Sequence, residues 1–344
     1  MNLTERSSPR ITGREGTFPL MGLACLLIVN SHLERLYPKS FLAADGLIGN
    51  TIFFLLAGYG VTLSQTLRPY AFTKFYVRRL LRICPSVVLV VIIGALIGFI
   101  SLPSGLGNVL SFIVWPTQFP FIERILVFYP IAWVLGRLSL KRGFYILAGA
   151  IGVWLATGIF AHIHLDPSDL RLGAISEAIW WGYHLCVFVA GALIGKQIAE
   201  TKGGATTTSP YAVLITTALL FGTYVALKFA YYRSSFASPV MVAMILQILG
   251  LSVSVGLFYL QHFFLLLSER LHLDLALLWI GKSSLQIYLS HLWFEEICAS
   301  LGVHWSVKVL SFFAFALMTG WLLRKLVETL ELITRQLTTK LKFT

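Results

Sequence analysis

The fold is decided by stretches such as Ile83-Cys-Pro-Ser-Val-Val-Leu-Val-Val-Ile-Ile-Gly-Ala-Leu-Ile-Gly-Phe-Ile-Ser-Leu102, which contains no charged side chain. Wound as an α-helix, a stretch of this length rises about 30 Å, which is the thickness of the hydrocarbon core of a bilayer. Arg78, Arg79 and Arg82 stand directly before it, where such a helix would leave the membrane. The stretch therefore predicts a transmembrane helix with a basic end.

Similar apolar blocks recur along the rest of the chain. Of its 344 residues 57% are hydrophobic and 12% are charged, whereas roughly a quarter of the residues of soluble proteins are charged. The mean hydropathy is +0.80, which excludes a water-soluble globular protein. We expect ten transmembrane helices, near residues 17–34, 46–66, 83–102, 120–138, 143–163, 177–197, 210–231, 240–267, 275–298 and 302–326. The sequence therefore predicts an all-α polytopic membrane helix bundle.

The basic residues lie unevenly in the connections between these helices. Alternate connections on one side of the membrane carry most of them, namely Arg6, Arg10, Arg14, Arg68, Lys74, Arg78, Arg79, Arg82, Arg137, Lys141, Arg142, Lys196, Lys202, Arg270, Arg324, Lys325, Arg335, Lys340 and Lys342. The opposite connections hold little beyond Arg35, Lys39, Arg171 and Arg233. Because Lys and Arg accumulate in cytoplasmic loops, we expect both termini in the cytoplasm. The chain then divides into a cytoplasmic arm at 1–16, a transmembrane domain at 17–326 and a cytoplasmic basic tail at 327–344.

The net charge of +12 follows this orientation rule and does not indicate a nucleic-acid partner. The cysteines show no CxxC spacing and fall within or at the edge of predicted spans, which is typical of buried apolar thiols: Cys25, Cys84, Cys186 and Cys298. No phosphate-binding loop, zinc-protease helix or serine-hydrolase elbow is present. His162 and His164 stand in an ordinary outward connection, so we expect no metal site.

His32 ends the first predicted helix, in Leu26-Leu-Ile-Val-Asn-Ser-His32-Leu, and Glu34 and Arg35 follow it. An ionisable group at the end of a membrane span is a candidate functional residue, because burying it in lipid is costly. A His at this interface can equally be solvated or hydrogen-bonded for structural reasons.

A second polar group lies in the ninth predicted helix, where Gln286, Tyr288, Ser290, His291, Glu295 and Glu296 fall within about three turns. His291 and Glu295 are four residues apart, so a continuous helix would place them on one face as a His–carboxylate pair. The alternative is a packing network that holds this helix in place.

The arginines before the third helix form the third group. Arg79 and Arg82 stand one turn apart, with Arg78 beside them, and Pro85 sits where a new helix can begin. Guanidinium groups suit phosphate oxygens, so the cluster is a candidate anion site. Simple anchoring to lipid headgroups explains such a cluster as well.

Together and in this order, these residues resemble the acyltransferase-3 family, whose members are multi-spanning membrane proteins that acylate sugars and cell-envelope polymers. Residues 22–32 resemble the family's first helix, which ends in its active-site His, and residues 49–59 resemble its second helix. Residues 79–85 are similar to its RxxR-x-x-P signature. Residues 280–291 are similar to its late helix, S-x-x-I-Y-L-x-H.

The sequence departs from the family pattern at three positions. Met21 stands where the family usually carries Arg or Lys, and Arg14 is the nearest upstream cation. Thr51 replaces a common Asp, and Ala57 replaces a common Ser.

The resemblance implies an acyl-CoA-dependent O-acyltransferase of the bacterial inner membrane. The implied donor is coenzyme A carrying an acyl group, for which we expect acetyl, and the implied acceptor is a hydroxyl of a sugar, glycolipid or surface polysaccharide. His32 would be the general base or the covalent acyl carrier, and no metal is required. The implied catalytic set is His32, His291 and Glu295, and the implied coenzyme A-binding set is Arg79, Arg82 and Arg78.

The spacing along the first helix fits donor and acceptor approaching from opposite sides. From Met21 to His32 a helix rises about 16 Å, which is similar to the length of a pantetheine arm. The sequence does not rank Glu295, Glu34 and Asp45 as the partner of His32, or Tyr288, Gln286 and Asn30 as donors to the oxyanion.

Two other functions stay open at this point. One is a proton-coupled exporter of a glycoconjugate, in which intramembrane His and Glu residues would relay protons, although the chain lacks the repeat symmetry typical of transporters. The other is a membrane assembly subunit. The oligomeric state is also open, a homo-oligomer included.

Overall fold

The computed structural model describes residues 14–43, 46–105, 107–108, 112, 118–164, 173–201, 209–233, 239–261, 270 and 273–341. Within these ranges every regular element is helical. The longer helices are α1 Phe18–Ser31, α2 Gly46–Leu67, α3 Phe72–Leu96, α5 Pro120–Leu135, α6 Leu140–His164, α7 Gly173–Glu200, α8 Pro210–Arg233, α9 Pro239–Tyr259, α11 Asp274–Ser290 and α13 Trp305–Leu341. Short segments are η1 Arg14–Thr17, η2 Ser40–Ala43, η4 His291–Phe294 and α12 Glu295–Ser300. Each predicted span corresponds to one of the longer helices, which confirms the all-α polytopic bundle.

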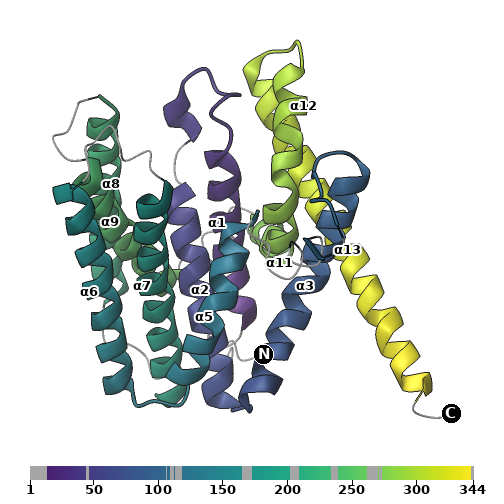
Figure 1. Ribbon diagram of the computed structural model, residues 1–344. Coiled ribbons are helices and arrows are strands. Elements are labelled where there is room, and N and C mark those ends of the chain that lie inside the picture. Colours follow the sequence, from purple (N-terminus) through teal and green to yellow (C-terminus); the bar gives the residue numbers. More distant parts are fainter. Residues whose placement is uncertain are drawn as a thin grey trace, which may run out of the picture.

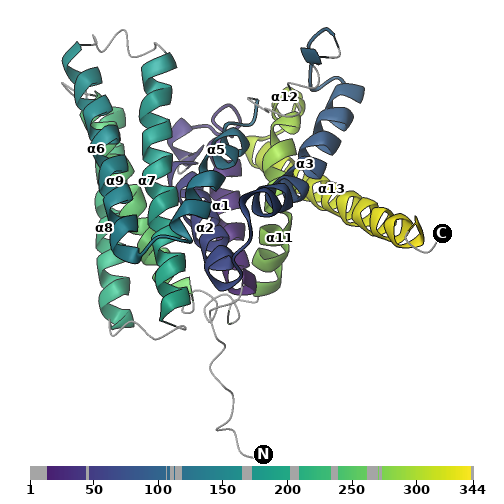
Figure 2. The same ribbon diagram turned by 60° about the horizontal axis from the view of Figure 1, so that its bottom comes forward.

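The helices fall into three groups, which Figures 1 and 2 show from two directions. Helices α6, α7, α8 and α9 form one side of the bundle, α1, α2 and α5 form the centre, and α3, α11, α12 and α13 form the other side. In Figure 1, α2 ends and α3 begins at the lower side of the bundle, whereas α1 and α11 end at the upper side. The long α13 tilts away, so that its C-terminal end lies at the edge of the molecule.

Seven of the helices are long and apolar enough to cross a bilayer, namely α2, α3, α6, α7, α8, α9 and α13. The other three are shorter, with 14 residues in α1, 16 in α5 and 17 in α11. At about 1.5 Å per residue, none of these three alone covers the hydrocarbon core of roughly 30 Å. All three border the predicted site.

Glycines allow two helix pairs to approach closely. A Cβ at Gly58 or Gly191 would collide with backbone carbonyls where α2 meets α7, and a Cβ at Gly22 or Gly281 would do the same where α1 meets α11. Small residues at such positions let membrane helices pack backbone to backbone. The second pair matters for function, because it aligns α1 with α11 along their length.

The third helix begins earlier than its apolar stretch predicts. We expected a span near 83–102 that starts close to Pro85, but α3 runs from Phe72 to Leu96 and contains Pro85 in its interior. Because proline removes only one helical hydrogen bond, neighbouring groups can compensate within a packed bundle. The arginines therefore belong to the helix itself and project from its first half.

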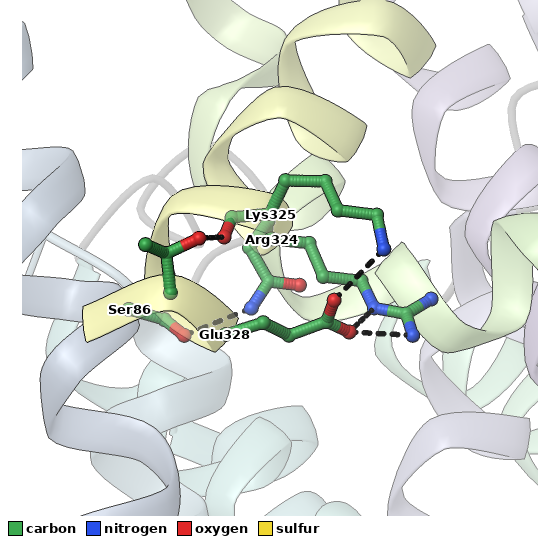
Figure 3. A network of polar contacts seen from close by, with 6 residues as sticks. Ser86, Arg324, Lys325 and Glu328 are labelled. Carbon is green, nitrogen blue, oxygen red and sulfur yellow. Dashed lines mark hydrogen bonds and ion pairs between the residues drawn. The ribbon is translucent and has the colours of Figure 1, made fainter. Parts of the chain in front are cut away.

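The last two predicted spans also differ from the structure. The span near 275–298 is broken, because α11 ends at Ser290 and the chain continues as η4 and α12. Helix α13 continues past the predicted end at 326 into the basic tail. Glu328 pairs there with Arg324 at 2.7 Å and with Lys325 at 3.0 Å (Figure 3). Pairs three and four residues apart stabilise a helix, which explains its extension.

Candidate active site

The upper ends of α1 and α11 bring two histidines together that lie far apart in the sequence. His32 caps the C-terminus of α1, and His291 directly follows the last residue of α11. Their ring centroids are 5.0 Å apart, with the planes tilted by 54°. His32 is exposed, whereas only 1% of the surface of His291 is accessible. Two of the predicted site residues therefore form one site.

The hydrogen bonds of His291 determine its tautomer. Nδ1 lies 2.8 Å from the carbonyl oxygen of Tyr288 and 3.2 Å from that of Ile287. Because carbonyl oxygens only accept hydrogen bonds, Nδ1 carries the proton and Nε2 is the acceptor nitrogen. Nε2 is buried and has no hydrogen-bond partner among the described residues.

The expected pair between His291 and Glu295 is not formed. The chain between them is the tighter η4 turn, so a four-residue spacing no longer places both side chains on one helical face. Glu295 instead lies 3.7 Å from Arg35, which also binds Glu296 at 2.7 Å. Among the described residues, neither Glu295 nor Glu34 forms a hydrogen bond or an ion pair with His32. Asp45, the third carboxylate considered, lies outside the described residues.

A cavity of about 530 Å³ lies between α1, α2, α3, α5 and α11. Arg68, Arg79 and Arg82 line it on the side where α2 ends and α3 begins, and Tyr288 lines it near the end of α11. Apolar side chains form much of the wall between them, among them Met21, Phe53, Leu56, Ile122 and Ile125. The cavity therefore has a cationic side and a wall that includes Tyr288, whereas neither His32 nor His291 lines it.

Only two of the three arginines in the predicted cluster line the cavity. Arg79 and Arg82 line it, whereas Arg78 does not and instead places its guanidinium 4.8 Å from the ring centre of Tyr70. Within the described part of the chain, neither Arg79 nor Arg82 forms an ion pair. Tyr129 is buried in the same wall.

Arg68 is a cavity residue that the sequence does not single out. It follows the last residue of α2 and is exposed at the cavity. In the sequence it is one of many cations on the basic side, and no motif marks it. Only the turn between α2 and α3 brings it to the same cavity as Arg79 and Arg82.

Of the three residues considered as oxyanion donors, only Tyr288 faces the cavity. Its hydroxyl accepts a hydrogen bond from the backbone N–H of Phe121 at 3.3 Å, and its ring centre lies 6.0 Å from that of His291. Gln286 donates to Ser86 of α3 at 2.9 Å, and Asn30 binds the carbonyl oxygen of Leu42 at 2.9 Å. Tyr288 thus separates the cavity from the histidine pair.

A second polar cluster lies between α5 and α7, with Arg124 and His184 buried and Glu177 exposed. Arg124 lies 3.0 Å from Nδ1 of His184 and 2.5 Å from Glu177. The ring of His184 stacks on Phe54 with the centroids 4.2 Å apart. None of Arg124, Glu177 and His184 lines the cavity. This cluster links two helices and adds no group to the candidate site. No motif in the sequence marks it.

The cysteines and histidines give no metal site in the part of the chain that the structure describes, where no group of three or more His, Cys, Asp or Glu side chains could hold a metal ion. Cys25, Cys186 and Cys298 are buried, Cys84 is half-buried, and all four are free thiols.

Comparison with known proteins gives one result. The family model of the acyltransferase-3 domain, described as an acyltransferase domain, matches residues 20–324. No curated protein matches the chain, and no solved structure does. The matched range begins in α1 and ends in α13, so it contains every residue of the cavity except Thr17.

Proposed function

We propose a reaction for this protein from one premise: the chain belongs to the acyltransferase-3 family, because that family's model spans most of its length. It is therefore a multi-pass membrane acyltransferase. We propose further that it moves an acetyl group from cytoplasmic acetyl-CoA to a hydroxyl of a sugar, glycolipid or surface polysaccharide. The proposed location is a bacterial inner membrane, with the arginine end of the cavity in the cytoplasm.

The cavity is the observation that carries this proposal. Coenzyme A has anionic phosphates at one end and an uncharged arm that ends in the thioester. Arg79, Arg82 and Arg68 provide guanidinium groups for the phosphates. The apolar wall beyond them suits the arm, and binding the phosphates needs no rearrangement of an existing ion pair at Arg79 or Arg82.

The direction of α1 supports transfer near His32. Met21 lines the cavity, and His32 follows it by three helical turns on nearly the same face, at a rise of about 16 Å. An arm that enters beside the arginines and extends along this face brings its thioester toward the histidine pair. Because His32 is exposed at the opposite end of α1, an acceptor can reach it from the outer side.

In the proposed reaction His32 takes the proton of the acceptor hydroxyl while the oxygen attacks the thioester carbonyl. The new C–O bond forms, the C–S bond breaks, and the coenzyme A thiolate leaves; the proton held by His32 passes to the thiolate, directly or through solvent, which restores the neutral imidazole. Tyr288 would donate a hydrogen bond from its hydroxyl to the oxyanion, since its oxygen already accepts one from Phe121. Burial disfavours the imidazolium that forms on His32, and the carboxylates of Glu295 and Glu34 would partly offset this effect.

An acyl-histidine route uses the same groups. His32 would attack the thioester carbonyl and release the coenzyme A thiolate, and the acceptor hydroxyl would then attack the acyl carbonyl on the ring, with the ring nitrogen as leaving group. Trapping an acylated His32 after incubation with donor alone would select this route. The absence of such an adduct, with transfer intact, would select direct attack. The family match indicates acyl transfer and gives no support to a transport function.

Donor binding tests the proposal, because the chain offers a matched control. Arg82→Gln should weaken binding of coenzyme A by about 10- to 100-fold, the factor that corresponds to loss of a hydrogen bond between charged groups. Arg78→Gln removes the same charge outside the cavity and should leave binding nearly unchanged. Calorimetry with coenzyme A on the purified protein in detergent measures both. Equal effects of the two variants would assign the arginines to general electrostatics or lipid anchoring.

Product analysis tests the transfer itself. Membranes that contain the native acceptor are given [14C]acetyl-CoA, and radioactivity is counted in the glycan fraction. Incorporation should depend on the protein, and mass spectrometry of the glycans should show the loss of one acetyl group per modified unit when the protein is absent. Glycans that are identical with and without the protein would contradict the proposed acceptor class.

A further inference from the structure

The Nε2 nitrogen of His291 has a lone pair that accepts no hydrogen bond from any described residue. Its Nδ1–H is bound to two backbone carbonyls, so its Nε2 can only accept. Among the described residues this nitrogen is buried without a partner. A buried acceptor that stays unpaired is costly in free energy, which calls for a donor within reach.

His32 is the donor that the geometry offers. An N–H···N hydrogen bond between two imidazoles places their centroids roughly 5 Å apart, because a nitrogen–nitrogen distance of about 3 Å is added to the distance from each nitrogen to its ring centre. The observed centroid distance is 5.0 Å. The two rings are tilted and not yet bonded, but His32 is exposed at a helix end, where its ring is free to turn.

The neighbouring carboxylates are less suited to this task. Arg35 engages both Glu295 and Glu296, and Glu34 is exposed to solvent. His291 is buried beside the ring of His32, and a neutral acceptor is less costly to bury than a carboxylate.

We propose that His291 is a positioning residue whose Nε2 accepts the N–H of His32 and thereby fixes the tautomer and ring orientation of His32. The other nitrogen of His32 is then unprotonated and faces the acceptor hydroxyl. During transfer the hydroxyl proton moves to that nitrogen, and His291 keeps its own proton throughout. The inference rests on the proposed role of His32 as base, and it replaces the carboxylates as partner of His32.

The rival explanation is that His291 only closes the end of α11 by binding the carbonyls of Tyr288 and Ile287. Two substitutions separate these roles, because Asn places its amide near the position of Nδ1 and Gln places its amide near that of Nε2. His291→Asn keeps a donor for the carbonyls and removes the acceptor for His32. His291→Gln keeps an acceptor for His32 and removes the donor for the carbonyls.

The test compares these variants with [14C]acetyl-CoA as the probe, in membranes that contain the native acceptor. His291→Asn should lower kcat by about 10- to 100-fold, the factor for a lost hydrogen bond to a group that becomes charged, with the KM for donor nearly unchanged. His291→Gln should retain more activity than His291→Asn, even if it is less stable to heat. The reverse order, with His291→Asn close to wild type, would overturn the inference in favour of a structural cap.

His32→Gln separates this inference from the proposed function. In that background His291→Asn should add little further loss, because a residue that acts through another has no effect once the other is gone. If His32→Gln lowers transfer but His291→Asn does not, the inference alone fails. If His32→Gln is fully active, or if the wild-type protein transfers no acetyl group, the proposed function fails and the inference fails with it.

Discussion

The two ends of the candidate site, the arginines that line the cavity and the histidine pair beyond Tyr288, are built in different ways. At the arginine end Arg79 and Arg82 come from one turn of a single helix, and neither has an ion-pair partner among the described residues. At the histidine end His32 and His291 come from opposite ends of the chain, and His291 is buried with a fixed tautomer. The difference teaches that neighbouring side chains of one helix suffice for the proposed anion site, whereas the proposed proton-transfer site needs two helices held in register.

Removing the proposed base, His32, should give the largest effect and should change transfer without changing donor binding. His32→Gln should lower the rate of transfer by about 10²- to 10⁴-fold at saturating acetyl-CoA, the usual share of general-base catalysis. Affinity for coenzyme A should stay within about threefold of wild type, because the arginine end is unchanged. Both quantities are measured on one purified sample. A variant that transfers at nearly the wild-type rate would move attention to His291 as the base.

A second test displaces α1 relative to α11 and compares the effect on transfer with the effect on donor binding. A Cβ at Gly281 would collide with the backbone carbonyl of Phe18, so Gly281→Ala forces the two helices apart. Transfer should fall by about 10-fold or more, since a displacement of roughly 1 Å at a catalytic site can cost up to about 100-fold. Binding of coenzyme A should change little.

Gly152→Ala is the control for this substitution, because nothing lies within 4 Å of the added Cβ in α6. It should leave both transfer and binding intact. If Gly281→Ala weakens donor binding as strongly as it lowers transfer, the arginine and histidine ends of the candidate site are not separable.

The exposed ion pairs at the histidine end should contribute least. Arg35→Gln breaks the contacts with Glu295 and Glu296, and the side chain of Arg35 is largely exposed, so we expect a loss of stability of only about 0 to 1 kcal/mol. Transfer should stay within about threefold of wild type, measured alongside thermal unfolding. A much larger loss of transfer at unchanged stability would assign Glu295 a direct part in the reaction. The sequence analysis predicts such a part, because it includes Glu295 in the implied catalytic set.

Much of the fold follows from local patterns. Each apolar stretch of about 20 residues has to form a helix in lipid, because its backbone polar groups find no other partners there. Ten stretches therefore predict ten helices, and the structure contains a helix at each. The ends of the helices were predicted less well, since the arginines of α3 and the basic part of α13 are helical although they are not apolar.

The candidate site, like the fold, was predicted only where a local pattern in the sequence marks it. The family match confirms the membership that the motifs around His32, Arg79 and His291 indicate, while the roles of these residues stay predictions. The prediction of a His291–Glu295 pair was wrong, because the spacing argument assumes a continuous helix and α11 ends at Ser290. Arg68 and the Arg124 cluster carry no local signal at all.

By itself the sequence determined the membrane class, the number of helices and the residue types of the site, because hydrophobicity and short motifs act over one or two helical turns. Only the tertiary structure decided which of those residues meet. The contact between His32 and His291 depends on glycines that let α1 and α11 approach, and the common cavity of Arg68 and Arg79 depends on a turn between two helices. Such contacts arise from packing between distant segments, which no local pattern encodes.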